Sequence, residues 1–162
     1  MDSLTYKQKS ITSKRHAICE EANTWLDTPY QHQAMVKGLD GAVDCAMLVV
    51  GVALECGLIT KEDITKVPNY SREWHMHQDI AMLTELMESF GCKKKKVTTI
   101  RPGDIVVFQL GRVASHLGIV MNRKVPCVIH AYAGSIQKVT ANQLTGKWLD
   151  RVASIYNFPG VK

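Results

Sequence analysis

Residues 43–50 read Val-Asp-Cys-Ala-Met-Leu-Val-Val, and the apolar run continues from there to Glu55. Asp44 is a preferred N-cap residue type, and Gly57 fits the position just beyond the last turn of a helix. The stretch therefore predicts a helix that begins after Asp44 and ends at Glu55. A helix that is apolar on every side is buried, so we expect this one to lie at the centre of the fold.

The segments on either side of this helix predict an α+β fold. Residues 11–27 and 71–90 carry apolar side chains at helical spacing, whereas residues 29–43 and 60–70 are irregular. Later segments are short, rich in β-formers and bounded by turns, which predicts strands at 104–110, 115–121, 126–132, 135–140 and 151–158, with a helical turn at 142–148. Helices followed by such strands indicate N-terminal helices packed on a C-terminal antiparallel sheet.

The composition is that of an ordinary globular domain. With 162 residues, 46% of them hydrophobic, the chain is long enough for one core, so we expect a single domain over residues 1–162. Five cysteines without a CxxC pair disfavour both a disulfide framework and a conventional zinc module. The net charge of +5 gives no specific case for nucleic-acid binding. The run Lys93–Lys96 is typical of a solvated loop.

Cys45 is the residue most indicative of chemistry, because it stands at the predicted helix N-terminus. Two histidines follow on predicted strands, His116 in Ser-His-Leu-Gly-Ile-Val and His130 in Val-Ile-His-Ala-Tyr. A helix N-terminus and an imidazolium both favour a thiolate, which is the form of cysteine that attacks a carbonyl. We therefore expect Cys45 as nucleophile, held by His116 as an ion pair, with His130 fixing the tautomer of His116. The backbone N–H of Cys45 would form half of an oxyanion hole.

This arrangement requires both imidazoles on one face of a hairpin. If Val120 pairs with Pro126, His116 lies directly opposite His130; if Met121 pairs with Cys127, the two histidines are diagonal neighbours. Either register puts them on the same face, about 5–8 Å apart. We favour the directly opposed register, because it gathers the apolar residues of both strands on the other, core-facing side.

Metal binding is the main alternative reading of these residues. Cys45, His116 and His130 could form a three-ligand catalytic zinc site, but we disfavour this reading because we expect no nearby carboxylate to orient the ligands or act as base. His75 and His77 are two residues apart on a predicted helix, where their side chains point away from each other. We therefore expect neither a metal nor another cofactor.

Three blocks of the sequence together resemble the NlpC/P60 family of papain-like cysteine peptidases, in particular its phage-tail-associated branch. The blocks are Thr28-Pro29-Tyr30 with His32-Gln33-Ala34 and Lys37-Gly38; Asp44-Cys45-Ala46 with Leu48-Val49 and Gly51-Val52; and Arg101-Pro102-Gly103-Asp104-Ile105-Val106-Val107-Phe108 with Ser115-His116-Leu117-Gly118-Ile119-Val120 and Ile129-His130-Ala131. They keep the family's order and cover about residues 25–132.

The resemblance implies a papain-like fold in which Cys45, His116 and His130 form the triad. It also implies that the Tyr30 hydroxyl assists the oxyanion and that Asp44 helps to bind a free amine of the substrate. The expected reaction is hydrolysis of amide bonds in the stem peptides of bacterial peptidoglycan. Phage tail proteins are the expected partners of a chain from the tail-associated branch.

Two other functions stay open on the sequence alone. The first is an acyltransferase or amide hydrolase acting on lipid or small-molecule amides, and the second is a tail-assembly or wall-binding protein without turnover. The N-terminus shows no signal peptide, and no apolar run approaches the roughly 18 residues that span a bilayer. We therefore expect synthesis in the cytoplasm, no membrane insertion, and delivery to the cell wall by a virion or on lysis.

Overall fold

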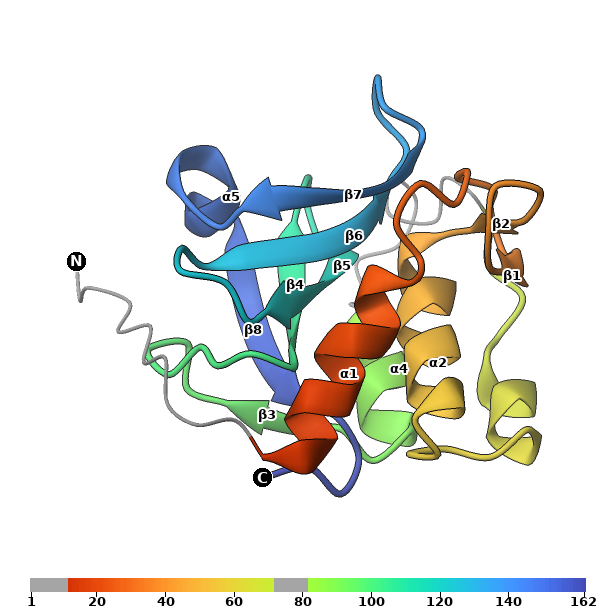
Figure 1. Cartoon of the computed structure of the whole chain (residues 1–162), viewed down its shortest axis with the longest axis horizontal. Coiled ribbons are helices and arrows are strands. Elements are labelled where there is room, and N and C mark those ends of the chain that lie inside the picture. The colour runs from red at the N-terminus through yellow and green to blue at the C-terminus, as the bar shows by residue number, and fades with distance from the viewer. Residues whose placement is uncertain (1–11, 72–81) are drawn as a thin grey trace.

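Helices α1, α2 and α4 lie against one face of an antiparallel sheet in the computed structural model, which describes residues 12–71 and 82–162 (Figure 1). The elements are α1 (Ser13–Asn23), β1 (Met35–Val36), β2 (Ala42–Val43), α2 (Cys45–Glu55), the 3-10 helix η1 (Glu62–Lys66), α4 (Met82–Ser89), β3 (Lys93–Lys95), β4 (Asp104–Gln109), β5 (Ala114–Met121), β6 (Cys127–Tyr132), β7 (Lys138–Gln143), α5 (Gly146–Asp150) and β8 (Val152–Asn157). The predicted order of helices first and strands afterwards is confirmed.

Helix α2 begins and ends where the sequence predicts. The Asp44 side chain accepts a hydrogen bond from the Met47 N–H at 2.8 Å and so caps the first turn. At the other end Gly57 has a φ of +66°, a conformation that favours glycine, and the chain leaves the helix there. Every residue from Ala46 to Ala53 is buried, as its all-apolar sequence requires.

Helix α1 is shorter than its predicted segment, 11–27, and α4 lies within the predicted segment 71–90. Helix α1 ends at Asn23, and the chain then turns until Asp27, whose φ of +66° is incompatible with a helix. Helix α4 occupies the end of the predicted segment 71–90, and most of the remainder, with His75 and His77, lies outside the described residues. Within residues 12–71 and 82–162, no helix is long and apolar enough to cross a membrane.

The strands form a sheet of order β3-β8-β4-β5-β6-β7, in which every neighbouring pair is antiparallel. Two predictions need correction. The lysine run is not a loop, because Lys93–Lys95 forms the edge strand β3 against β8; charged side chains on an edge strand discourage pairing with another chain. Strand β7 covers residues 138–143 rather than 135–140, so only the short helix α5 fits before β8.

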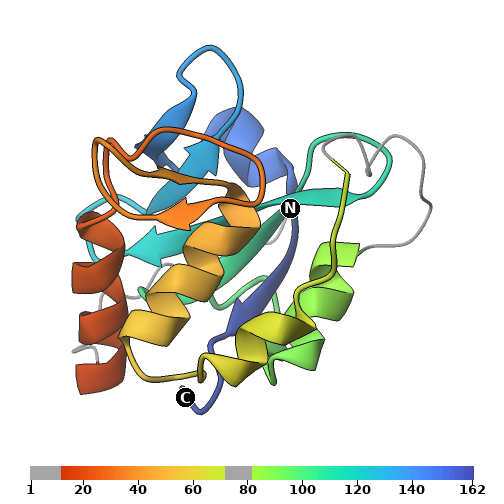
Figure 2. The same ribbon diagram turned by 90° about the vertical axis from the view of Figure 1, so that its right-hand side faces the viewer.

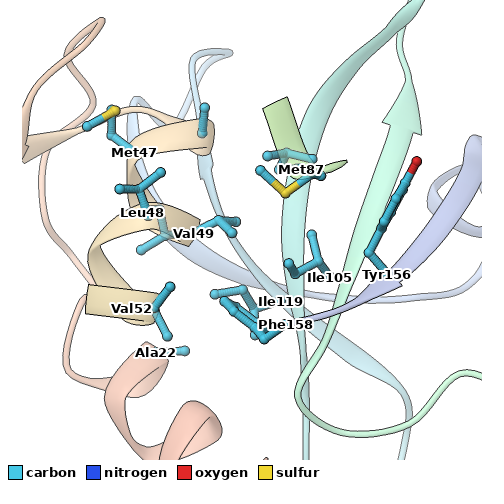
Figure 3. Packing of buried hydrophobic residues seen from close by; sticks show 14 of the residues in the cluster. Ala22, Met47, Leu48, Val49, Val52, Met87, Ile105, Ile119, Tyr156 and Phe158 are labelled. Carbon is cyan, nitrogen blue, oxygen red and sulfur yellow. The ribbon is translucent and has the colours of Figure 1, made fainter. Parts of the chain in front are cut away.

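Each face of the sheet has its own apolar cluster. Ile105, Ile119 and Ile129 belong to the cluster that includes the buried residues of α1, α2 and α4. Figure 2, turned by 90° from Figure 1, shows these helices in front of the sheet. In Figure 3, side chains of α2 such as Val49 and Val52 face Ile105 and Ile119 across this interface. Val120 and Val128 point to the opposite face, where Trp148 of α5 packs.

Candidate active site

Cys45 is the first residue of α2 and lines a cavity of about 310 Å³. The side chain is partly exposed to this cavity while the next residue, Ala46, is buried. The other residues of the cavity wall come from several elements: Tyr30, His32, Asp44, Ala46, Tyr70, Leu83, Leu110, Ser115, His116, Ala131, Tyr132 and Ala133. The fold therefore brings the predicted nucleophile and His116 to the wall of the same cavity, although 71 positions separate them in the chain.

The β5–β6 hairpin has the second of the two registers considered, so our preference for the directly opposed register was wrong. Met121 pairs with Cys127 and Ile119 with Ile129, which makes His116 and His130 diagonal neighbours. Both imidazoles still lie on one face, and Nε2 of His116 is 2.6 Å from Nδ1 of His130. The predicted side-by-side placement of the two histidines is therefore confirmed.

Gly118 makes this diagonal contact possible. It lies between the two histidines on the same face of the sheet, and a Cβ added there would sit 3.3 Å from the Phe108 ring and 3.5 Å from the His130 Cβ. A larger side chain at this position would have to displace one of these groups. The glycine of the Ser-His-Leu-Gly motif thus has a packing role next to the histidine pair.

The histidine pair is hydrogen-bonded to a third polar side chain, that of Asn142 on β7. Nε2 of His130 is 2.8 Å from Oδ1 of Asn142, and an amide oxygen only accepts hydrogen bonds. His130 therefore carries its proton on Nε2 and accepts at Nδ1, which places the proton of the neighbouring contact on Nε2 of His116. The remaining nitrogen of His116, Nδ1, is left with a lone pair, which is the form that a general base requires.

Aromatic rings enclose the two imidazoles. The Trp148 ring lies edge-on to His130 at 4.7 Å between centroids, and the Phe108 and Tyr132 rings lie within 6 Å of His116. His130 is fully buried and His116 is 5% exposed. Burial lowers the pKa of His116 well below its usual value, with a further contribution from His130; burial also lowers the pKa of His130, and the hydrogen bond with Asn142 opposes this effect. Both imidazoles are neutral at pH 7.

The Cys45 thiol is also neutral in this site. Burial, with a second contribution from the neighbouring Asp44 carboxylate, raises the pKa of Cys45 to about 12, and backbone hydrogen bonds led by Leu117 only partly oppose this. We predicted a thiolate–imidazolium ion pair from the helix N-terminus alone. Desolvation and this carboxylate favour the neutral thiol and oppose the predicted ion pair, which stays a prediction.

Asp44 connects three parts of the cavity wall. Oδ1 accepts from the Met47 N–H, and Oδ2 accepts from the Gln33 N–H at 2.7 Å and from the Tyr70 hydroxyl at 2.6 Å. Burial and the Asp44 carboxylate raise the pKa of Tyr70, so this hydroxyl keeps its proton and acts as the donor. His32 completes the group, since its Nε2 donates to the Tyr70 carbonyl oxygen at 2.7 Å. Asp44 thus fixes both the helix start and the loops before and after α2.

Tyr30 lies where the resemblance places it, on the wall of the cavity with Cys45. A parallel bridge to Val43 and a hydrogen bond from its N–H to the Gln137 carbonyl oxygen at 2.8 Å hold its backbone. The bridge connects Tyr30 to Val43, which immediately precedes Asp44, the N-cap residue of α2. Its side chain is half-buried.

The histidine geometry argues against the three-ligand zinc alternative. A shared metal needs lone pairs that converge on one point, whereas Nε2 of His116 and Nδ1 of His130 are in direct hydrogen-bond contact with each other. Within residues 12–71 and 82–162 we find no cluster of three or more His, Cys, Asp or Glu side chains arranged to hold a metal ion.

Three residues of this site were not predicted: Asn142, Tyr70 and Trp148. Each reaches the site through a contact between distant segments, so sequence spacing gave no indication of it. Asn142 offered one signal, because asparagine is uncommon in strands. A correct prediction of the β6–β7 register would have shown that it lies near His130.

The fold is shared with two solved NlpC/P60 structures. One is an NLP/P60-family protein from Staphylococcus aureus subsp. aureus Mu50 described as similar to lipoprotein, with a TM-score of 0.58 and 16% sequence identity; the match covers 98% of this chain and 45% of that one. The other is the NlpC/p60 domain of the peptidoglycan hydrolase SagA, with a TM-score of 0.51, 17% identity, and coverage of 88% and 97%. No family model and no curated protein matches the sequence.

These likenesses confirm the predicted fold class, α+β with a papain-like NlpC/P60 arrangement. The chain spans less than half the length of the staphylococcal protein, whereas it matches nearly the whole SagA domain. At 16% and 17% identity the likeness concerns the fold, and the function has to be argued from the site.

Proposed function

We propose that the chain is an NlpC/P60-family cysteine peptidase or amidase that hydrolyses amide bonds in the stem peptides of bacterial peptidoglycan. The observation that carries the proposal is the shared cavity: Cys45, at a helix N-terminus, and His116, which is hydrogen-bonded to His130 through Nε2, line the same cavity. The substrate class is supported by the fold, which is also that of a peptidoglycan hydrolase domain.

In this proposal His116 acts as a general base rather than as half of a resting ion pair. As Sγ of Cys45 forms a bond to the substrate carbonyl carbon, Nδ1 of His116 takes the thiol proton. The carbonyl oxygen becomes an oxyanion that accepts from the Cys45 N–H, with the Tyr30 hydroxyl as the proposed second donor. His116 then gives its proton to the leaving amine as the C–N bond breaks. Water hydrolyses the remaining thioester and restores the thiol.

In this scheme the Cys45 thiol gives its proton to His116 only while it attacks a substrate. The thiol and imidazole are both neutral in the unliganded site. Transfer of the proton in step with attack avoids a free thiolate beside the Asp44 carboxylate. His130 would stabilise the imidazolium that forms on His116, because its Nδ1 accepts from the Nε2–H.

Delivery by a phage tail is part of the same proposal. It rests on the sequence resemblance to the tail-associated branch, including the His32-Gln33-Ala34 segment before the nucleophile. A tail assembly would bring the domain to the cell wall, and tail proteins would then be its partners.

One observation favours a second candidate, a tail-assembly or wall-binding protein that keeps the fold without turnover. A thiol with a pKa of about 12 is a poor nucleophile at neutral pH unless a base assists it. On this view the cavity would bind a stem peptide without cleaving it.

Mass spectrometry of purified stem peptides incubated with the protein separates the two candidates. The comparison needs Cys45→Ala as the inactive variant and Cys56→Ala as a matched control, since Cys56 is a half-buried cysteine at the other end of α2. Cleavage by the wild type and Cys56→Ala, but not by Cys45→Ala, supports the peptidase and identifies the bond. Binding of the peptides without cleavage by any of the three proteins supports the non-catalytic candidate.

A further inference from the structure

We propose that Asn142 is a positioning residue that fixes which nitrogen of His116 carries the proton and which keeps its lone pair. The inference rests on the proposed function, because it matters only if His116 is the base. It extends the predicted Cys45–His116–His130 triad by a fourth side chain, on a strand that the sequence argument did not connect with the site.

Asn142 is the last member of a short hydrogen-bonded chain that runs from His116 through His130. Asn142 lies on β7, which pairs with β6, and its Oδ1 is 2.8 Å from Nε2 of His130. His130 is fully buried, so Nε2 has no water to replace this partner. The next contact, from Nε2 of His116 to Nδ1 of His130, is 2.6 Å long. His130 therefore uses both ring nitrogens, Nε2 toward Asn142 and Nδ1 toward His116. His116 uses Nε2 in this contact and lines the cavity with Cys45, so Nδ1 is the nitrogen left for the role of base.

The direction of this chain depends on Asn142. Two neutral imidazoles in contact have two possible proton arrangements, and in the other one His116 would carry its proton on Nδ1 and could not act as a base toward Cys45. The amide oxygen selects the productive arrangement, because it accepts the proton of His130 Nε2. Phe108, Tyr132 and Trp148 pack around the two imidazoles through their rings, and the hydrogen bond at this nitrogen comes from Asn142.

Asn142→Asp and Asn142→Leu test this role in opposite directions. Aspartate only accepts, so Asn142→Asp must keep the arrangement, and its charge should raise the pKa of His130. Leucine neither accepts nor donates, so Asn142→Leu should release the tautomer preference. Gln143→Leu is the matched control, because Gln143 is the next residue of β7 and is exposed.

The first measurement is the ring ¹⁵N chemical shifts of His116 at pH 7.5, which report the tautomer without any substrate. We expect the Nε2–H tautomer in the wild type, Asn142→Asp and Gln143→Leu, and a mixture or the Nδ1–H form in Asn142→Leu. An unchanged tautomer in folded Asn142→Leu, or a switch to Nδ1–H in Asn142→Asp, overturns the proposal. If Asn142→Leu does not fold, the pKa of His130 in Asn142→Asp decides it: a pKa equal to that of the wild type overturns the proposal.

The second measurement is the pH profile of stem-peptide cleavage. We expect Asn142→Leu to lower kcat with little change in KM, by less than the roughly 10⁴-fold loss known for a triad left in the wrong tautomer. Asn142→Asp should retain activity and shift the acidic limb of the profile to higher pH. Equal kcat in Asn142→Leu and Gln143→Leu overturns the proposal. The predicted tautomer change with no cleavage by the wild type instead leaves Asn142 positioned as described and refutes the peptidase.

Discussion

The two imidazoles of the site stay neutral because the protein removes them from water. His130 is fully buried and His116 nearly so, and aromatic rings rather than carboxylates surround them. A neutral pair can pass a proton in either direction, whereas a permanently charged imidazolium could not accept one from Cys45. The low pKa values of the two histidines therefore leave His116 able to accept a proton from Cys45. They also lower the free energy of unfolding at acidic pH.

We expect the free energy of unfolding to fall as the pH drops below about 6.5, the ordinary pKa of histidine. The folded-state pKa values of His116 and His130 are lowered, so between the two pKa values the unfolded chain binds protons that the folded chain does not. Both histidines should contribute to this loss, and His116, whose pKa is lowered well below its usual value, should contribute more than His130. Urea denaturation at several pH values measures this loss.

The control for this prediction is His16→Gln, because His16 is exposed on α1. That variant should keep the acid-induced loss, whereas His130→Gln should reduce it. A wild-type unfolding free energy that is constant from pH 7.5 to pH 5.5 would contradict the assignment of neutral buried histidines.

The sequence predicted those site residues whose chemistry is visible in a local motif. Cys45 follows a cap residue, and His116 and His130 lie on one face of a hairpin in either of the two registers considered. Asn142 and Tyr70 were missed because their role comes from a partner elsewhere in the chain: His130 on the adjacent strand and Asp44 at the start of α2. The thiol pKa was missed for the same reason, since burial of Cys45 is a property of the folded cavity.

At the scale of the element, Asp44 is the residue on which α2 depends most. Asp44→Ala should lower the free energy of unfolding by about 2–4 kcal/mol, because it removes a helix cap and leaves the Gln33 N–H and Tyr70 hydroxyl without their acceptor. Asp44→Asn keeps one amide oxygen and should lose less. Chemical denaturation of the three proteins measures the difference.

Asp40→Ala is the matched control for Asp44, since Asp40 is an exposed aspartate in the loop just before β2. It should change the free energy of unfolding by less than about 0.5 kcal/mol. Equal losses for Asp44→Ala and Asp40→Ala would show that the cap and its hydrogen bonds contribute little to the fold.

Element boundaries were predictable where a local signal marks them, as Asp44 and Gly57 do for α2. The edge strand β3 was not, because three consecutive lysines have low β-propensity and are held there by pairing with β8. Lys95 adds a tertiary contact, an ion pair with Asp104 at 2.6 Å. The hairpin register was wrong for a related reason: apolar alternation constrains which face of a strand is buried, but it does not distinguish two registers of equal parity.

At the scale of the whole molecule, a buried arginine joins both ends of the described chain to the sheet. Arg15 of α1 donates to the carbonyl oxygens of Lys162 at 2.9 Å and Pro102 at 2.8 Å. It also donates to Oδ1 of Asp104 and to Oδ1 of Asn157, each at 2.8 Å. The Arg15 and Asp104 side chains are both fully buried, so water cannot replace either partner.

Arg15→Ala should therefore lower the free energy of unfolding by about 2–4 kcal/mol, because it removes the fully buried partner of the Asp104 carboxylate, which keeps its ion pair with Lys95, and leaves the buried Pro102 carbonyl oxygen without this donor. Lys14→Ala is the matched control: Lys14 precedes Arg15 on α1, and its side chain donates to the Gly160 carbonyl oxygen at an exposed position.

The double variant Arg15→Met with Asp104→Leu separates charge from packing. If the loss in Arg15→Ala arises from the stranded Asp104 carboxylate, removing both charges should recover part of it, and urea denaturation would show a positive coupling between the two sites. Lys95 also contacts Asp104 at 2.6 Å. Its ammonium group is partly exposed and can turn to solvent, so the double variant does not leave Lys95 as a buried charge without a partner. A double variant no more stable than Arg15→Ala would instead mean that Arg15 acts through its bonds to Pro102, Asn157 and Lys162. The attachment of α1 to the sheet would then depend on the shape of the guanidinium rather than on its charge.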